Sequence, residues 1–115
     1  MDKEELITKW QKEMKKGFAK PLLLKAISKG STYPYKLSKI IEEETQGQIK
    51  IATTNIYPLL RDLTDDGLIV KFDYQESFRT YYKITEDGKK FLILLQQSIE
   101  EFFKIIGLTV LKEYK

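Results

Sequence analysis

Apolar residues recur at helical spacing in the first part of the chain. In residues 2–16 they form one stripe, made up of Leu6, Ile7, Trp10 and Met14. In residues 19–29 the apolar face is broader, and Pro21 fits the first turn of a helix because its missing N–H is not needed there. We therefore expect an amphipathic helix over residues 2–16 and a central core helix over residues 19–29.

A third helix is expected to start near residues 31–34 and to end by residues 46–47. Hydroxyl residues and an early proline are typical of a helix start, and Ser31, Thr32 and Pro34 supply them. Its inward face consists of Leu37, Ile40 and Ile41.

A fourth helix is expected over residues 54–66, with an inward face of Ile56, Leu60 and Leu63. Pro58 is compatible with this helix only near its first turn, so we expect the helix to start between residues 54 and 56 with a Thr or Asn cap. Gly67 suits the left-handed position that follows a helix. Leu68 can then contact Leu63, which predicts a Schellman ending.

After Gly67 the period of the pattern changes from helical to two. Residues 68–74 and 78–84 are rich in β-branched and aromatic side chains and flank the polar residues 75–77. This pattern predicts a β-hairpin with its turn at residues 75–77.

A long final helix is expected after Thr85, which can cap it. Apolar residues then repeat at heptad spacing, namely Leu92, Leu95, Ile99, Phe102 and Ile106, and Phe103 widens the stripe. So wide a face is hard to bury within one small domain, and we interpret it as a dimer helix. The alternative is that this helix folds back on the core of its own chain.

The predicted fold class is mainly α with a small β-hairpin: a winged helix-turn-helix with N-terminal and long C-terminal dimerisation helices. Residues 1–17 are expected to be an N-terminal dimer-contact helix, residues 18–85 the DNA-binding domain and residues 86–115 the C-terminal dimerisation helix. The expected dimer interface comprises Leu6, Ile7, Trp10, Met14, Leu92, Leu95, Ile99, Phe102, Phe103 and Ile106.

Composition narrows the range of functions. The chain of 115 residues has no His and no Cys, so Ser-His pairs, thiolate nucleophiles, disulfides and ordinary zinc sites are excluded. We expect no enzyme activity, no metal and no cofactor. The mean hydropathy of −0.39 and the polar, acidic start of the chain favour a cytoplasmic protein without a membrane span.

Charge and element order together point to double-stranded DNA. Between residues 9 and 39 the chain has nine lysines and one glutamate, so this stretch is a candidate phosphate-facing surface. The helix that precedes a wing is expected to enter the major groove. Its outward face should present Thr53, Thr54, Asn55, Pro58 and Arg61. Arg79 lies in the wing, and Lys36 and Lys39 would add phosphate contacts.

The chain resembles the PadR family of winged-helix transcriptional regulators over nearly its whole length. The resemblance lies in residues 55–69, with Tyr57-Pro58 and Asp66-Gly67-Leu68, and in residues 79–88 of the wing. It implies a homodimer that binds a pseudo-palindromic operator, usually as a repressor. Tyr35 and Lys83 are added to the expected DNA contacts on this resemblance.

Two departures from the family pattern concern the first helix of the motif and the last helix of the chain. Pro34-Tyr35 stands where the family often has Gly-Tyr. Some short-tailed members stack flat aromatic compounds on a Trp of the last helix, but the single Trp here is Trp10, so ligand binding is not carried over. We interpret Tyr57 and Tyr81 as half-buried core residues and leave Tyr82 open.

Two other hypotheses remain at this point. The first is a protein-interaction winged helix whose tyrosine-rich hairpin binds a partner. The second adds a small-molecule effector cavity at the dimer interface, near Trp10 and Phe102.

Overall fold

The computed structural model describes residues 2–73 and 77–113. Its elements, in chain order, are α1 (Lys3–Lys15), the 3-10 turn η1 (Lys16–Phe18), α2 (Ala19–Ser28), α3 (Pro34–Glu44), α4 (Thr53–Asp65), β1 (Ile69–Asp73), β2 (Thr80–Ile84) and α5 (Glu86–Val110). The fold is mainly helical with one antiparallel hairpin, which confirms the predicted fold class. The bounds of α1, α2 and α4 lie within one residue of those expected from the sequence, whereas α5 ends before the end of the segment assigned to it.

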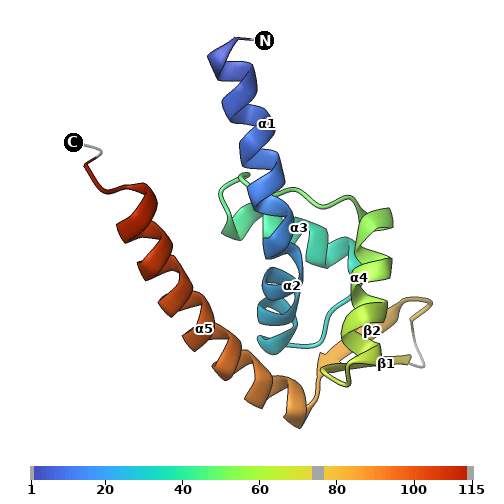
Figure 1. Ribbon diagram of the computed structural model, residues 1–115. Coiled ribbons are helices and arrows are strands. Elements are labelled where there is room, and N and C mark those ends of the chain that lie inside the picture. Colours follow the sequence, from blue (N-terminus) through green and yellow to red (C-terminus); the bar gives the residue numbers. More distant parts are fainter. Residues whose placement is uncertain (1, 74–76, 114–115) are drawn as a thin grey trace.

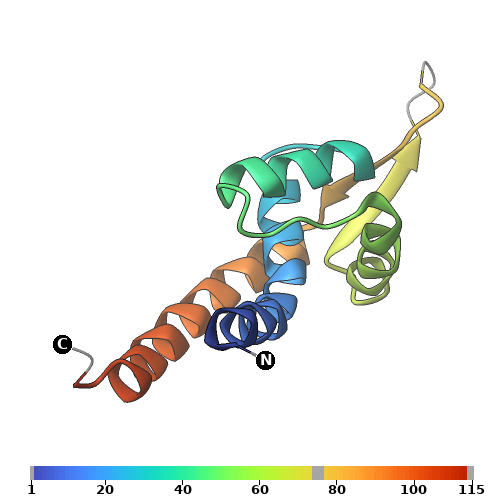
Figure 2. The ribbon, with the colours of Figure 1, turned by 90° about the horizontal axis from the view of Figure 1, so that it is seen from above.

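Two long helices project from one side of the body. Figure 1 shows α1 and α5 diverging upward from the body formed by α2, α3, α4 and the hairpin. Seen from above in Figure 2, α1 lies between α5 and α4, and the hairpin extends away at the opposite end. The molecule measures 56 × 32 × 22 Å.

The core surrounds α2, which packs against α3, α4, α5 and β2. Burial of apolar surface is the main favourable term in folding. The side chains with almost no exposure are Leu23, Leu24, Ile27, Leu37, Ile41, Ile56, Leu60 and Ile69. Leu24 was not expected on the inward face of α2, and Ile69 belongs to β1; the other six come from the inward faces expected for α2, α3 and α4.

The start of α3 differs from the expected hydroxyl cap. Its N-cap residue is Tyr33, which makes no side-chain capping bond. Thr32 is instead buried and pairs with Tyr82: its N–H donates to the Tyr82 carbonyl at 3.1 Å, and its carbonyl accepts from the Tyr82 N–H at 2.8 Å. The hydroxyl-rich segment therefore joins the hairpin to the body.

The start of α4 also differs from the expectation. Ala52 is the N-cap, without a side-chain capping bond, and the helix begins at Thr53. The reason lies in α3, where the Ser38 hydroxyl donates to the Ile51 carbonyl at 2.9 Å and lies 3.4 Å from the Thr53 hydroxyl. Pro58 is consequently inside the helix, beyond its first turn.

The predicted Schellman ending of α4 is confirmed. Gly67 has φ of 76°, in the left-handed region that favours glycine. The Leu68 N–H donates to the Leu63 carbonyl and the Gly67 N–H to the Thr64 carbonyl, both at 3.0 Å. The expected cap of α5 is confirmed as well, because the Thr85 hydroxyl accepts from the Gly88 N–H at 2.9 Å.

The hairpin pairs β1 with β2 in a register that runs from Ile69 opposite Ile84 to Asp73 opposite Thr80. Residues 75 and 76 of the expected turn lie outside the described residues, so that prediction is not tested. Because side chains alternate along a strand, Lys71 and Tyr82 share one face of the hairpin, whereas Phe72 and Lys83 belong to the other.

Most apolar side chains of α1 and α5 are exposed in the single chain. No residue of α1 is buried, and Trp10 is 61% exposed. On α5, Phe102 is 58% exposed, and Phe103 packs edge-on against Phe18 with ring centroids 5.5 Å apart. Leu92 is an exception, since it is buried in the core of its own chain, and its assignment to a dimer interface is corrected.

Candidate nucleic-acid interface

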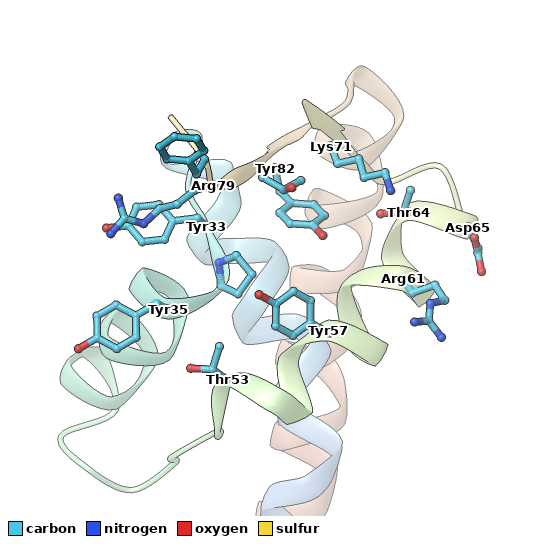
Figure 3. Close-up of a pocket in the computed structure, with 13 residues that line it drawn as sticks. Tyr33, Tyr35, Thr53, Tyr57, Arg61, Thr64, Asp65, Lys71, Arg79 and Tyr82 are labelled. Carbon is cyan, nitrogen blue, oxygen red and sulfur yellow. The ribbon is translucent and has the colours of Figure 1, made fainter. Parts of the chain in front are cut away.

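A hollow of about 650 Å³ lies between the start of α3, one face of α4 and the hairpin. Figure 3 shows side chains from all three elements around it. Its lining consists of Tyr33, Pro34, Tyr35, Thr53, Tyr57, Arg61, Thr64, Asp65, Lys71, Phe78, Arg79, Thr80 and Tyr82. We call it the recognition hollow.

One face of α4 forms the floor of the recognition hollow. Thr53, Tyr57 and Arg61 are spaced four residues apart, so they lie along the same side of the helix. Tyr57 is 51% exposed, so it is half-buried as expected, but it lines the hollow and is not part of the core. The helix therefore presents a hydroxyl, a phenol and a guanidinium to the hollow.

The tyrosine before α3 holds Arg79 at the rim. The Arg79 guanidinium lies 4.6 Å from the centre of the Tyr33 ring, and Tyr33 in turn packs edge-on against Tyr81 at 5.3 Å. A guanidinium over a ring face keeps its N–H donors free at the edge. Arg79 can therefore be positioned by aromatic packing and still bind a phosphate.

Lys71 and Tyr82 come from the hairpin, where they lie opposite each other. Tyr82 is buried, and burial, with a smaller contribution from Tyr57, raises the pKa of the Tyr82 phenol above its ordinary value. The phenol therefore stays neutral and can donate a hydrogen bond. The sequence pattern did not indicate Tyr33, Tyr57, Lys71 or Tyr82 as residues of the hollow, although the alternation of strand faces could have indicated Lys71.

Neither Lys36 nor Lys39 of α3 lines the recognition hollow, although Tyr35 of the same helix does. The Lys39 ammonium lies 4.7 Å from the centre of the Tyr35 ring. A hydrogen bond with the Tyr35 side chain is the largest cause that raises the pKa of Lys39. Tyr35 itself is 55% exposed and lines the hollow, so it connects Lys39 to this surface.

The structure brings Tyr35, Thr53, Arg61 and Arg79 together and separates the other expected contacts. Asn55 and Pro58 line a different hollow on the opposite side of α4, and the exposed Thr54 lines neither. Lys83 lies on the other face of the hairpin, with its ammonium 5.3 Å from the centre of the Phe72 ring.

A smaller apolar hollow of about 380 Å³ lies between the end of α1 and α5. It is lined by Met14, Gly17, Phe18, Pro21, Leu95, Ser98, Ile99, Phe102 and Phe103. Phe102 thus lines a hollow, as the effector hypothesis expected, but Trp10 does not.

The described ranges of the chain place no group of three or more His, Cys, Asp or Glu residues where it could hold a metal ion. In the same ranges no helix is both long and apolar enough to cross a membrane.

Solved structures with the same fold include several transcriptional regulators. A PadR family regulator from Eggerthella lenta is 22% identical, with 96% of each chain covered and a TM-score of 0.81. A PadR-like regulator from Bacillus cereus is 30% identical, with 85% of this chain and 92% of that chain covered and a TM-score of 0.68.

A third structure is described as Bacillus subtilis PadR in complex with operator DNA. It is 26% identical, with 67% of this chain and 46% of that chain covered and a TM-score of 0.60. A comparison with curated protein sequences gave no match. The family model described as "Transcriptional regulator PadR-like family" matches residues 23–93, which is more than half of the sequence. The protein therefore belongs to the PadR-like family of transcriptional regulators.

Proposed function

We propose that the chain regulates transcription by binding double-stranded operator DNA through the recognition hollow and the outward face of α4. The observation that carries this proposal is the convergence of Arg61, Lys71 and Arg79 on one hollow beside an exposed helix face. Arginine can bind guanine or phosphate with two hydrogen bonds, and lysine adds a phosphate contact. The α4 helix enters the major groove, and the hairpin contacts the adjacent backbone.

The operator complex of Bacillus subtilis PadR supports this assignment, because its structure shares the fold of this chain. The recognition hollow of this chain is also suited to binding DNA. Three bases and one acid, Asp65, line it, so its charge favours a polyanion only modestly. Two half-sites bound together then raise the affinity that one subunit provides.

The proposed assembly is a homodimer in which residues 1–17 and 86–115 supply the contacts and residues 18–85 bind DNA. The exposed apolar stripes of α1 and α5 support it, because a large exposed apolar surface marks an interaction site. A two-fold dimer matches a pseudo-palindromic operator. We propose repression as the regulatory outcome, which a promoter-reporter assay in cells with and without the protein measures.

The test of DNA binding is a titration of purified protein against DNA fragments selected from the genome of its source. Arg61→Ala should weaken a selected site by about 1–3 kcal/mol and relax its sequence preference. Affinity should also fall steeply with salt. Undetectable or salt-insensitive binding by the wild-type protein would exclude the proposal.

A second candidate is protein interaction through the hairpin. Phe78 favours it, because its side chain is fully exposed at the edge of the hairpin. In a pull-down, a protein partner should persist after nuclease treatment, survive Arg61→Ala and be lost with Phe78→Ala. Loss of the partner after nuclease would assign the interaction to DNA.

The effector hypothesis concerns the apolar hollow beside Phe102 and Phe103. Trp10 lies one helical turn before Met14, which lines this hollow, so the single Trp can report on a ligand bound there. Titration with a panel of aromatic compounds, followed by Trp10 fluorescence, tests it. A panel without any response would leave the hypothesis unsupported.

A further inference from the structure

Helix α1 has two distinct faces. Leu6, Ile7, Trp10 and Met14 form the apolar one. The opposite face, together with η1, residues 47–51 and the start of α4, encloses a hollow of about 800 Å³, which we call the lysine hollow. It is lined by Thr8, Gln11, Lys12, Lys15, Lys16, Ala19, Gly47, Gln48, Ile49, Lys50, Ile51, Asn55, Pro58 and Leu59.

The lysine hollow is more basic than the recognition hollow, because its lining contains four lysines and no carboxylate. Lys50 lies 3.7 Å from a Glu42 oxygen, and the Lys15 ammonium donates to the Gln48 side chain at 3.1 Å. Within the described part of the chain, Lys12, Lys15 and Lys16 form no ion pair. Their positive charges are therefore available to an anionic partner.

The position of this hollow relative to α4 suggests which anion it meets. Asn55 and Pro58, on the first two turns of α4, form part of its lining. Figures 1 and 2 agree that α1 lies between α4 and α5. The proposed dimer is taken to have α5 at its two-fold axis, which puts α1 between the recognition helix and that axis. A duplex seated on α4 runs past α1 as it approaches the centre of the operator.

We propose that Lys12, Lys15 and Lys16 bind DNA phosphates on the central side of each half-site. This inference rests on the proposed function, because it takes the duplex to be bound at α4. Lysine is a point charge without the planar fork of arginine, so these contacts set affinity and salt dependence and leave sequence preference unchanged. They supply phosphate attraction that the recognition hollow provides only weakly, because Asp65 offsets one of the three basic side chains there.

The test compares two triple variants that lose the same charge. Lys12→Gln/Lys15→Gln/Lys16→Gln removes the proposed contacts, whereas Lys9→Gln/Lys104→Gln/Lys112→Gln removes three exposed lysines outside the hollow. Fluorescence anisotropy with a selected operator is measured at several salt concentrations. Each lost phosphate contact makes the negative slope of log K against log salt shallower by about 0.9. The slope of the first variant should therefore be shallower than that of the wild type by about 2–3 per subunit. The control variant should keep the wild-type slope.

A second experiment uses the wild-type protein and altered DNA. Neutral methylphosphonates replace phosphates between the two half-sites. The wild-type protein should lose affinity for this DNA. The Lys12→Gln/Lys15→Gln/Lys16→Gln variant should bind the altered and the unaltered DNA equally. Thermal unfolding checks that each variant is folded.

The outcomes separate this inference from the proposed function. If the wild-type protein binds no selected DNA, the proposed function fails and this inference fails with it. If the wild-type protein binds but the two triple variants share one slope, or central methylphosphonates leave its affinity unchanged, only the inference is overturned.

Discussion

The hydroxyl of Thr85 donates a hydrogen bond to the carbonyl oxygen of Gly67 at 2.7 Å. The same hydroxyl accepts from the Gly88 N–H, and the Thr85 N–H donates to the Leu68 carbonyl at 3.0 Å. One residue thereby joins the end of α4 to the start of α5. In the proposed dimer, this joint fixes the angle between the DNA-reading helix and the helix that spans to the partner.

Thr85→Val should lower the free energy of unfolding by about 1–3 kcal/mol, because it removes a helix cap and leaves polar groups without a partner. Thr85→Ser keeps the hydroxyl and should retain most of the stability. Urea unfolding followed by circular dichroism measures both. A Thr85→Val protein as stable as the wild type would show that the joint contributes nothing.

Gly88→Ala should destabilise the fold by about 1–3 kcal/mol, as overpacking does. A Cβ at this position would collide with the Leu68 carbonyl oxygen and lie 2.7 Å from the Ile84 side chain. Gly107→Ala is the matched control, because it lies in the same helix with nothing within 4 Å. The control should gain about 0.4–1 kcal/mol in the same unfolding experiment. Equal effects at the two positions would contradict the close packing at Gly88.

Lys71→Gln should weaken binding to all DNA sequences to a similar extent and lower the salt slope by about 1 per subunit. Lys71 lines the recognition hollow, whereas Lys83 lies on the opposite face of the same hairpin. Lys83→Gln therefore serves as the control and should leave the slope unchanged. The assignment of the DNA-facing side would be reversed if Lys83→Gln gave the larger loss.

Ile7→Glu should convert the proposed dimer to monomers, because it places a charge on the exposed apolar stripe of α1. Lys9→Glu alters charge on the same helix but outside that stripe, so it should remain dimeric. Analytical ultracentrifugation measures the mass of each protein. A wild-type chain that sediments as a monomer would remove the basis for two half-sites.

The raised pKa of Tyr82 predicts a loss of stability at high pH. Because burial raises the pKa of the folded phenol above the ordinary tyrosine value of 10.0, the folded state retains this proton more tightly than the unfolded state. The resulting stabilisation is complete below pH 10 and disappears as the pH rises through the folded pKa. Tyr82→Phe should show a smaller loss of stability than the wild type over that range. Identical pH profiles would contradict the assignment.

Local signals predicted the helix ends that depend on neighbouring residues alone. Gly67 and Leu68 specify the end of α4 through backbone geometry, and Thr85 caps α5 directly. The start of α4 was placed too late because Ser38, far away in sequence, holds Ile51 and Thr53. The periodicity of hydrophobic residues does not reveal such a tertiary contact.

The recognition hollow was only partly predictable for the same reason. Arg61 and Arg79 could be assigned from element order, and both line it. Tyr33 and Tyr82 were missed because their role depends on how the segment before α3 pairs with the hairpin. Leu92 was assigned to the dimer stripe because heptad spacing does not reveal which members of a stripe the chain's own core already covers.

The most direct test of the central claim is a footprint of the purified wild-type protein on DNA fragments that it selects from a genomic pool. Two subunits related by a two-fold axis should protect an inverted repeat, with half-site centres about one helical turn, or a multiple of it, apart. Selection of no common sequence, or protection of a single site without its inverted partner, would contradict the claim.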